Sequence, residues 1–331
     1  MIALLGATGY TGKLVAEELA RRRLPHRLGA RDPQRLAALP TADDRETFVV
    51  DAAEATRLDA FLDGADALIN TVGPFLRLSV PVVEAAVRSG VPYVDSTGEQ
   101  EFMSLVYERF AGAPVPIVPA CAAEYIPQDL AAAIALGDLG GDASEIGVHT
   151  RTTGALPSRG TARTTIEMAA SMFSSPAGRR VRRVPFPSGA RTVPELPFGD
   201  RAIARHAGDA RVVTTFSVPG FSGPVARLLP AVLSRLGPIV DRLPEGPSPR
   251  ARQRARFEIL AEAIGAGGRA AVTCWGRDVY GITGRFLVEA ALRVEGGGAM
   301  APAEALEPAA FFDAVSGAHD GVEFGWRRLP T

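Results

Sequence analysis

Lysine is almost absent from this chain, which has 331 residues and a single lysine, Lys13. Positive charge is therefore carried almost entirely by arginine, and the formal net charge is only -1. A near-neutral balance gives no reason to expect nucleic acid or an anionic membrane as a partner. The length suits two compact domains better than one small core.

Cysteine and histidine are also scarce, with two and four residues. Cys121 and Cys274 are too few for a disulfide framework or a thiolate zinc site, and the histidines do not cluster, so no metal is expected. No run of ~18 apolar residues is free of charges and breakers, so no membrane span is expected. The apolar start "MIALL" leads into a turn motif, not a signal-peptide cleavage site. These absences predict a cytoplasmic protein.

What the chain does have, over residues 1–130, is an alternation of short apolar runs and amphipathic stretches. The expected strands are 1–5, 26–31, 46–52, 65–74, 91–99 and 115–121, and the expected helices include 11–23 and 79–90. Strands separated by helices predict right-handed crossovers and a parallel sheet. The expected fold class is α/β, with a doubly wound Rossmann sheet in this part of the chain.

A glycine motif joins the first expected strand to the first expected helix. Its residues are Gly6, Ala7, Thr8, Gly9, Tyr10, Thr11 and Gly12. Gly6 permits a tight turn, Gly9 lets backbone amides approach a pyrophosphate, and Gly12 lets the helix pack closely on the sheet. The helix N-terminus adds amides and a positive dipole. A glycine turn without a ligand is the alternative, but the strand–turn–helix order favours a dinucleotide site.

The end of the second strand predicts NADP(H) in preference to NAD(H). NAD enzymes commonly place an acidic residue there to bind the ribose 2′-hydroxyl, whereas this chain has two small residues followed by Arg31. Arg31 and Arg35 could bind a 2′-phosphate. Asp32 precedes Pro33 and is expected to cap the next helix, which turns its carboxylate away from the ribose. The alternative is that both arginines are ordinary surface charges.

Asp51 ends the third expected strand and has two possible roles. Its carboxylate could accept a hydrogen bond from the adenine amino group, or it could cap a helix over residues 53–63.

The pattern changes after about residue 140. Residues 143–154 predict a long strand and 160–173 a helix, whereas 174–210 have no clear period. Two strand-like runs flank Gly265–Gly268, which predicts a hairpin in a mixed or antiparallel sheet with one wetter face. Two further helices are expected at 280–294 and 302–317, packing beside the first domain. The predicted division is 1–130 with 278–331, and a second, α+β domain over 140–277.

Four stretches of the chain resemble the saccharopine dehydrogenase-like oxidoreductases, a family that includes saccharopine reductases and trans-acting enoyl reductases. They are "GATGYTGKLVAEEL" (6–19), "NTVGPFLRLSVPVVEAAVRSGVPYVDSTGE" (70–99), "IPQDLAA" (126–132) and "YGITGRFLVEAAL" (280–292). The resemblance implies an NADP(H) enzyme whose second domain binds substrate and dimerises. A homodimer through residues 140–275 is expected, because the antiparallel second sheet should have an exposed face or edge of the kind that a partner often covers.

The resemblance also concerns the turn after the fourth strand, at the edge of the sheet where ligands bind. It implies that this turn contacts the nicotinamide ribose, through Asn70, Val72, Gly73, Pro74 and Phe75. The alternative is a simple strand-ending turn. The chain departs from the family after the sixth strand, where "CAAEY" (121–125) replaces a glycine and a small polar residue, so the substrate cannot be carried over.

Hydride transfer asks little of the protein beyond positioning and a proton donor. Lys13 lies in the first expected helix, and Tyr10 is one position too near to form the Tyr-x-x-x-Lys pair of short-chain dehydrogenases. The donor must then be tyrosine, histidine, a carboxyl group or water. Tyr125 is the first candidate, followed by Tyr280 and Glu99. Each could equally be a buried structural tyrosine or a helix-capping carboxylate.

The expected function is reduction of a C=N or activated C=C bond of a small-molecule metabolite by NADPH. A non-catalytic NADP-binding regulator and a ketoreductase remain alternatives, because a Rossmann domain alone does not dictate chemistry. Residues 140–275 separate the enzyme from the regulator, since an enzyme needs a largely apolar cleft with a few polar groups.

Overall fold

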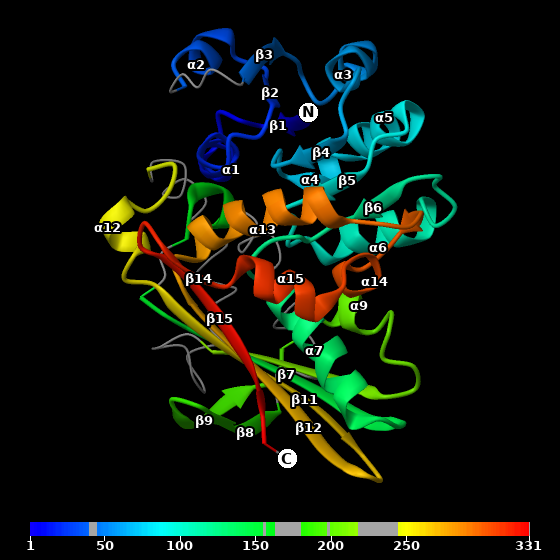
Figure 1. Cartoon of the computed structure of the whole chain (residues 1–331), viewed down its shortest axis with the longest axis vertical. Helices are drawn as coiled ribbons and strands as arrows, with labels where there is room; N and C mark the ends of the chain where they lie inside the picture. The colour runs from blue at the N-terminus through cyan, green and yellow to red at the C-terminus, as the bar shows by residue number, and fades with distance from the viewer. Residues whose placement is uncertain (40–44, 155–156, 163–179, 197–198, 218–243, 331) are drawn as a thin grey trace. The chain divides into compact units, whose positions relative to one another are not determined.

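The computed structural model describes residues 1–39, 45–154, 157–162, 180–196, 199–217 and 244–330. The chain divides into two compact units (Figure 1). Unit 1 comprises Met1–Ile126 and Tyr280–Glu307, and unit 2 comprises Pro127–Val279 and Pro308–Thr331.

Within the described residues, unit 1 contains a seven-stranded parallel sheet of order β13-β6-β5-β4-β1-β2-β3. The strands are β1 (Ile2–Leu5), β2 (His26–Ala30), β3 (Arg45–Val49), β4 (Ala67–Asn70), β5 (Tyr93–Asp95), β6 (Pro116–Val118) and β13 (Gly298–Ala299). The predicted Rossmann sheet is confirmed. Strands β2 and β3 extend the sheet on one side of β1, and β4, β5 and β6 extend it on the other side. Doubly wound sheets bind ligands at the carboxyl ends of the strands where the order reverses in this way.

Helices connect these strands. They are α1 (Tyr10–Arg21), α2 (Pro33–Ala37), α3 (Ala55–Leu62), α4 (Phe75–Leu78), α5 (Val80–Ser89), α6 (Gln100–Arg109), α13 (Val279–Arg293) and α14 (Pro302–Ala305). The predicted helix over 302–317 is instead two helices, α14 and α15 (Pro308–Val315). Pro308 explains the break, because a residue that precedes proline is disfavoured in helical conformation.

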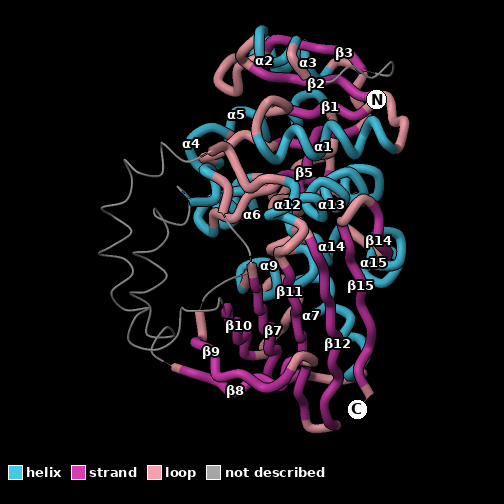
Figure 2. Tube along the Cα trace, turned by 90° about the vertical axis from the view of Figure 1, so that its left-hand side faces the viewer, coloured by secondary structure: helices cyan, strands magenta, loops and turns pink. Residues whose placement is uncertain are grey.

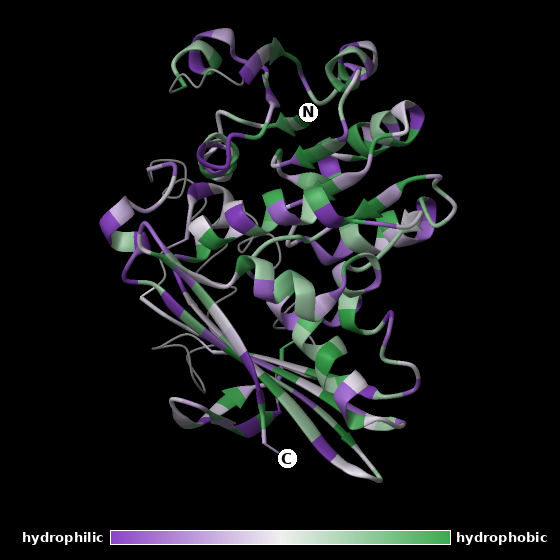
Figure 3. Ribbon diagram, in the orientation of Figure 1, coloured by the Kyte–Doolittle hydropathy of each residue, from purple (hydrophilic) through white to green (hydrophobic). Residues whose placement is uncertain are grey.

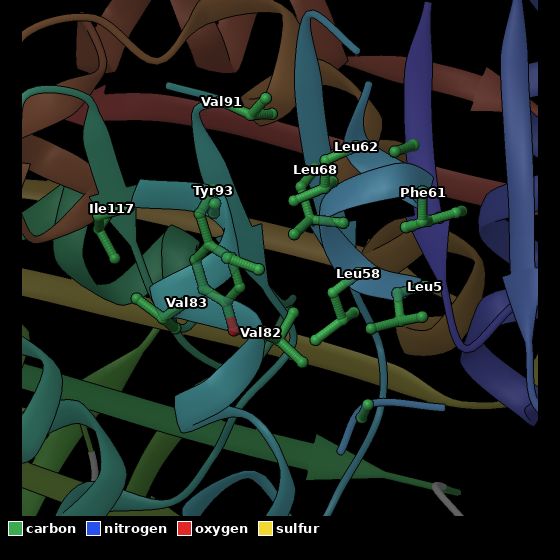
Figure 4. Packing of buried hydrophobic residues seen from close by; sticks show 14 of the residues in the cluster. Leu5, Leu58, Phe61, Leu62, Leu68, Val82, Val83, Val91, Tyr93 and Ile117 are labelled. Atoms are coloured by element: carbon green, nitrogen blue, oxygen red, sulfur yellow. The ribbon is translucent and has the colours of Figure 1, made fainter. Parts of the chain in front are cut away.

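The main core of unit 1 packs one face of the sheet against α3 and α5 (Figure 4). Leu68 of β4, Phe61 of α3 and Val82 of α5 are all fully buried in it. Burial of each such side chain stabilises the fold by about 1.5–3 kcal/mol. Leu4 of β1 and Ile69 of β4, which point to the other face, are buried too, so these two central strands are buried on both faces (Figure 3).

Within the described residues, unit 2 contains a six-stranded mixed sheet of order β10-β7-β11-β12-β15-β14, whose long strands are seen in Figure 2. The strands are β7 (Ala143–Thr153), β10 (Arg211–Ser217), β11 (Arg256–Gly265), β12 (Gly268–Arg277), β14 (Gly317–His319) and β15 (Val322–Leu329). A separate hairpin consists of β8 (Val181–Phe186) and β9 (Gly189–Pro194). The helices are α7 (Ile126–Leu139), α9 (Asp200–Ile203), α12 (Pro249–Arg252) and α15.

The structure contains the predicted glycine hairpin, with β11 and β12 paired from Arg256↔Arg277 to Gly265↔Gly268. The face of this sheet that was predicted to be more exposed to solvent is partly covered, because Phe186 and Val193 of the β8–β9 hairpin pack on Leu260 of β11. The β8–β9 hairpin lies within residues 174–210, where the sequence has no clear hydrophobic period. The predicted helix over 160–173 lies mostly outside the described residues.

The structure differs from the predicted division at the C-terminal end of the chain. Residues 308–329 belong to unit 2, where β15 pairs with β12 from Ala271↔Leu329 to Arg277↔Glu323. The rings of Phe312 and Phe324 also join α15 to β15, with centroids 5.4 Å apart. Residues 280–307 are the part grouped with unit 1.

Candidate nucleotide and active site

The glycine turn between β1 and α1 has the geometry of a phosphate cradle. Gly6 has φ +87°, which a residue with a side chain rarely adopts, and a Cβ on Gly12 would lie 2.1 Å from the Gly6 carbonyl oxygen. Helix α1 starts after Gly9 with no side-chain cap on the described chain and no acidic residue in its first turn. Its first amides therefore face an environment suited to an anion, and the residues fit the pyrophosphate of a dinucleotide.

Hydrogen bonds hold this turn to its neighbours at the carboxyl edge of the sheet. The Gly6 amide donates to the Gly29 carbonyl at 2.9 Å, and the Thr71 amide donates to the Leu5 carbonyl at 3.0 Å. Arg35 donates from Nη2 to the Thr8 carbonyl at 2.9 Å. Arg35 therefore ties α2 to the glycine turn, a contact that the sequence did not predict. Its role at a 2′-phosphate stays a prediction.

Asp32 caps α2 as predicted. Its Oδ1 accepts hydrogen bonds from the amides of Gln34 at 2.9 Å and Arg35 at 3.1 Å, with Pro33 at the first helical position. The carboxylate is therefore committed to the helix. Arg31 is exposed directly before this cap.

Asp51 does not cap a helix over 53–63. Its Oδ1 accepts a hydrogen bond from the Ala53 amide at 3.0 Å, and α3 begins only at Ala55, with Glu54 as its N-cap. The predicted adenine contact of Asp51 stays a prediction.

The side chain of Asn70 lies wholly inside the protein, at the end of β4. Its Nδ2 donates to Ser79 Oγ at 2.8 Å and to the Tyr93 hydroxyl at 3.1 Å, and its Oδ1 accepts from the Val72 amide at 3.0 Å. Every polar atom of the side chain is thus used to shape the following turn. The Gly73–Pro74 peptide bond in that turn is cis.

Asp95, at the end of β5, completes this buried group. Its Oδ2 accepts from the Tyr93 hydroxyl at 2.7 Å, and its Oδ1 accepts from the amides of Thr97 at 2.8 Å and Ala120 at 2.9 Å. Desolvation raises the pKa of Asp95 to about 7, against the opposing effect of these hydrogen bonds. Burial also raises the pKa of Tyr93 well above its ordinary value.

Glu99 caps the short helix that follows the Gly73–Pro74 turn. Its two carboxylate oxygens accept hydrogen bonds from the amides of Phe75 at 2.8 Å and Leu76 at 2.9 Å. Glu99 is thus a helix-capping carboxylate, which was one of the two roles considered for it. The helix that it caps is α4 and not α6, which follows it in the chain. Both oxygens are therefore committed to positioning the turn, and the predicted role of Glu99 in proton transfer stays a prediction.

Tyr125 and Tyr280 have different surroundings. Tyr125 is buried, and its hydroxyl donates to the Gly98 carbonyl at 2.9 Å, next to Glu99. Tyr280 packs edge-on against Tyr10 at the start of α1, with ring centroids 5.1 Å apart. The hydrogen-bonded loops thus bring Tyr125 and Glu99 together with the 70–75 turn, whereas Tyr280 lies beside the glycine turn.

Sequence reasoning missed two groups of residues near this edge. Ser79, Tyr93 and Asp95 were overlooked as a polar cluster, although a tyrosine and an aspartate in a short buried strand were a usable signal. Glu124 follows β6, and desolvation raises the pKa of its carboxyl. Neither group was among the predicted site residues.

Across the described ranges, no three histidine, cysteine, aspartate or glutamate side chains are grouped as a metal site. No described helix combines the length and the apolar character needed to cross a bilayer. Cys121 and Cys274 are both buried, and no disulfide joins them.

The sheet order and the glycine turn define a dinucleotide-binding protein of the Rossmann class. Residues 2–115 match the family described as the saccharopine dehydrogenase NADP binding domain, so this part of the chain is similar to that domain. The predicted family resemblance and the NADP(H) cofactor are thereby confirmed.

Two relatives and one solved structure extend the comparison. The chain is 37% identical over 140 residues to a trans-acting enoyl reductase of Mycobacterium ulcerans, and 36% identical over 140 residues to that of Mycobacterium leprae. Each match covers 39% of this chain and 34% of the relative, so the chain spans about a third of their length. Saccharopine dehydrogenase (L-Glu forming) from Saccharomyces cerevisiae shares the fold, with a TM-score of 0.63, 12% identity and 99% coverage of both chains.

Proposed function

We propose that this protein is an NADPH-dependent oxidoreductase that reduces a C=N or activated C=C bond of a small-molecule metabolite. The observation that carries the proposal is the hydrogen-bonded edge of unit 1. There, an anion-binding turn at α1 lies in one connected set of loops with the 70–75 turn and with Tyr125. The NADP-binding family and the enoyl reductase names of the relatives support it. Bound NADPH would supply the hydride.

Each part of this edge has a proposed role in binding. The amides at Gly9–Gly12 bind the pyrophosphate, and Arg31 binds the 2′-phosphate, because a guanidinium can form two parallel hydrogen bonds to a phosphate. Asp51 accepts from the adenine amino group. Val72, Gly73 and Pro74 line the nicotinamide half, where a glycine allows close approach.

Two neighbouring side chains are proposed as the source of the proton. Tyr125 remains the first candidate, although its hydroxyl proton already points to the Gly98 carbonyl. Glu124 is the second, because a carboxyl with a raised pKa keeps more of its proton near neutral pH. Tyr125→Phe or Glu124→Gln should lower turnover about a hundredfold for the true donor, while NADPH affinity is unchanged. The other variant serves as the matched control.

The function is tested with a substrate panel containing a cyclic imine, a 2-enoyl thioester and a simple ketone. Consumption of NADPH is followed by its absorbance. Turnover of the imine or the enoyl thioester supports the proposal. Turnover of the ketone alone identifies a ketoreductase, and tight NADPH binding without turnover of any class identifies a regulator.

We also propose that the protein is cytoplasmic and forms a homodimer through residues 140–275. Trp275 in β12 is 38% exposed and Val181 in β8 is 65% exposed, so each leaves apolar surface that a second copy of the chain could cover. Light scattering should give a dimer mass, and Trp275→Glu should convert it to a monomer. A monomeric wild type at working concentration would remove the proposal.

A further inference from the structure

The buried polar side chains at the ends of β4 and β5 form one continuous hydrogen-bonded chain. It runs from Asp95 through the Tyr93 hydroxyl to Asn70, and then to Ser79. All four side chains have 0% exposure. Polar groups buried this completely are costly unless they are fully satisfied, so their arrangement is tightly specified.

This chain ends on the backbone of the turn proposed to line the nicotinamide. Ser79 donates from Oγ to the Val72 carbonyl at 3.0 Å, and Asn70 accepts from the Val72 amide at 3.0 Å. Both polar groups of the Val72 backbone are therefore held by the network. A shift of these side chains therefore changes the position of the backbone at Val72 and at Gly73 beside it.

The direction of each hydrogen bond follows from the carboxylate. Ionised Asp95 can only accept, so the Tyr93 hydroxyl donates to it and must accept from Asn70. The two Nδ2 hydrogens of Asn70 then go to Tyr93 and Ser79, and the Ser79 hydroxyl donates to Val72. In this state every hydrogen of the network has one acceptor. A proton added at Oδ2 of Asp95 leaves the same groups with one hydrogen more than they have acceptors.

We propose that Asp95, Tyr93, Asn70 and Ser79 are positioning residues that transmit the protonation state of Asp95 to the Val72–Gly73 turn and so set nucleotide affinity. The ionised form holds the turn in its binding shape. The proposal rests on the proposed function, since it takes this turn as part of the NADPH site.

Several titratable or polar groups face Asp95 from the elements packed against it. Tyr93 faces it from its own strand, with a pKa well above its ordinary value. Glu99 faces it from the start of α6, and its charge adds to the rise in the pKa of Asp95 after desolvation. Cys121 lies beyond β6, where its amide donates to the Asp95 carbonyl at 2.7 Å. Thr97 and Ala120 contribute only backbone amides.

The test is a set of NADPH titrations, read by cofactor fluorescence, between about pH 5.5 and about pH 8.5. Asp95→Asn resembles the protonated form, because its amide also directs hydrogens at Tyr93. The wild type should match it at the acid end and bind NADPH about tenfold more tightly at the alkaline end. The 2′-phosphate titrates equally in both proteins, so the ratio of affinities isolates Asp95.

Tyr93→Phe is the second variant, for the case in which Asp95→Asn does not fold. It keeps the carboxyl group but cuts its link to Asn70, so the rise in affinity with pH should be lost. His26→Asn is the matched control, because His26 is a buried polar residue at the opposite end of a strand in the same sheet. It should keep the wild-type pH profile.

The outcomes separate the two proposals. If the ratio of the NADPH affinities of the wild type and Asp95→Asn is the same at all pH values, the positioning role is overturned and the proposed function stands. The same holds if Tyr93→Phe keeps the wild-type profile. A folded wild type that binds no NADPH at any pH overturns the proposed function itself.

Discussion

Replacing Asp95 with asparagine should change how the stability of unit 1 depends on pH. Desolvation raises the pKa of Asp95 from 3.8 to about 7 in the folded protein, whereas the unfolded chain keeps the ordinary value. Between these two pKa values the folded state binds one more proton than the unfolded state. The contribution of Asp95 to stability is therefore greatest at low pH and is lost as the pH rises through about 7.

The magnitude follows from the span of pH over which the two states differ. One pKa unit corresponds to about 1.4 kcal/mol. Between about pH 5.5 and the pKa of Asp95 in the folded protein lie about 1.5 pH units, and above that pKa both states are ionised. Raising the pH from about 5.5 to about 8.5 should therefore lower the free energy of unfolding of the wild type by about 2 kcal/mol. The asparagine variant cannot titrate at this position. Its free energy of unfolding should therefore be about 2 kcal/mol less sensitive to this change in pH.

Urea unfolding read by hydrogen exchange of peptides from β4 and β5 measures this directly in unit 1. Both tryptophans, Trp275 and Trp326, lie in unit 2 and provide a separate fluorescence signal from the same samples. The quantity to compare is the difference in unfolding free energy between wild type and variant at each pH. If that difference is the same at both ends of the range, Asp95 titrates alike in the two states and the reasoning is wrong.

Three further predictions concern the cofactor site. Gly12→Ala should lower the free energy of unfolding by about 1–3 kcal/mol or more, because its Cβ would lie 2.1 Å from the Gly6 carbonyl oxygen. In Gly9→Ala the added Cβ would lie 3.3 Å from the same oxygen, so this variant should fold normally but bind NADPH poorly. Equal melting temperatures of the two variants would contradict this prediction. Glu99→Gln should speed hydrogen exchange at the start of α4, because one amide oxygen must replace two carboxylate oxygens. Arg31→Ala should weaken NADPH about ten- to a hundredfold and leave NADH nearly unchanged, and equal losses in titration would reassign Arg31 to the fold.

The Rossmann part of the fold could be predicted because its signals are local. Apolar runs bounded by glycine, and a turn whose spacing suits a helix start, depend on a few adjacent residues. β13 could not be predicted, because two residues carry no period. β15 was missed because it becomes a strand only by pairing with β12, about 50 residues earlier in the chain.

The candidate site shows the same limit. The glycine turn and the Asp32 cap follow from short motifs, and both were predicted. A tyrosine and an aspartate in one short strand were a signal for buried polar groups, but the network also needs Asn70 and Ser79 from other segments to meet them, and that meeting depends on the fold. Glu99 was predicted near the site, but its contact with α4 depends on the same convergence.

A crystal structure with NADP⁺ bound would test the proposed nucleotide site. We expect the pyrophosphate against the amides of Gly9–Gly12, the 2′-phosphate beside Arg31, and the nicotinamide beside the Val72–Gly73 turn. A nucleotide bound elsewhere, or bound with its nicotinamide turned away from that turn, would contradict it.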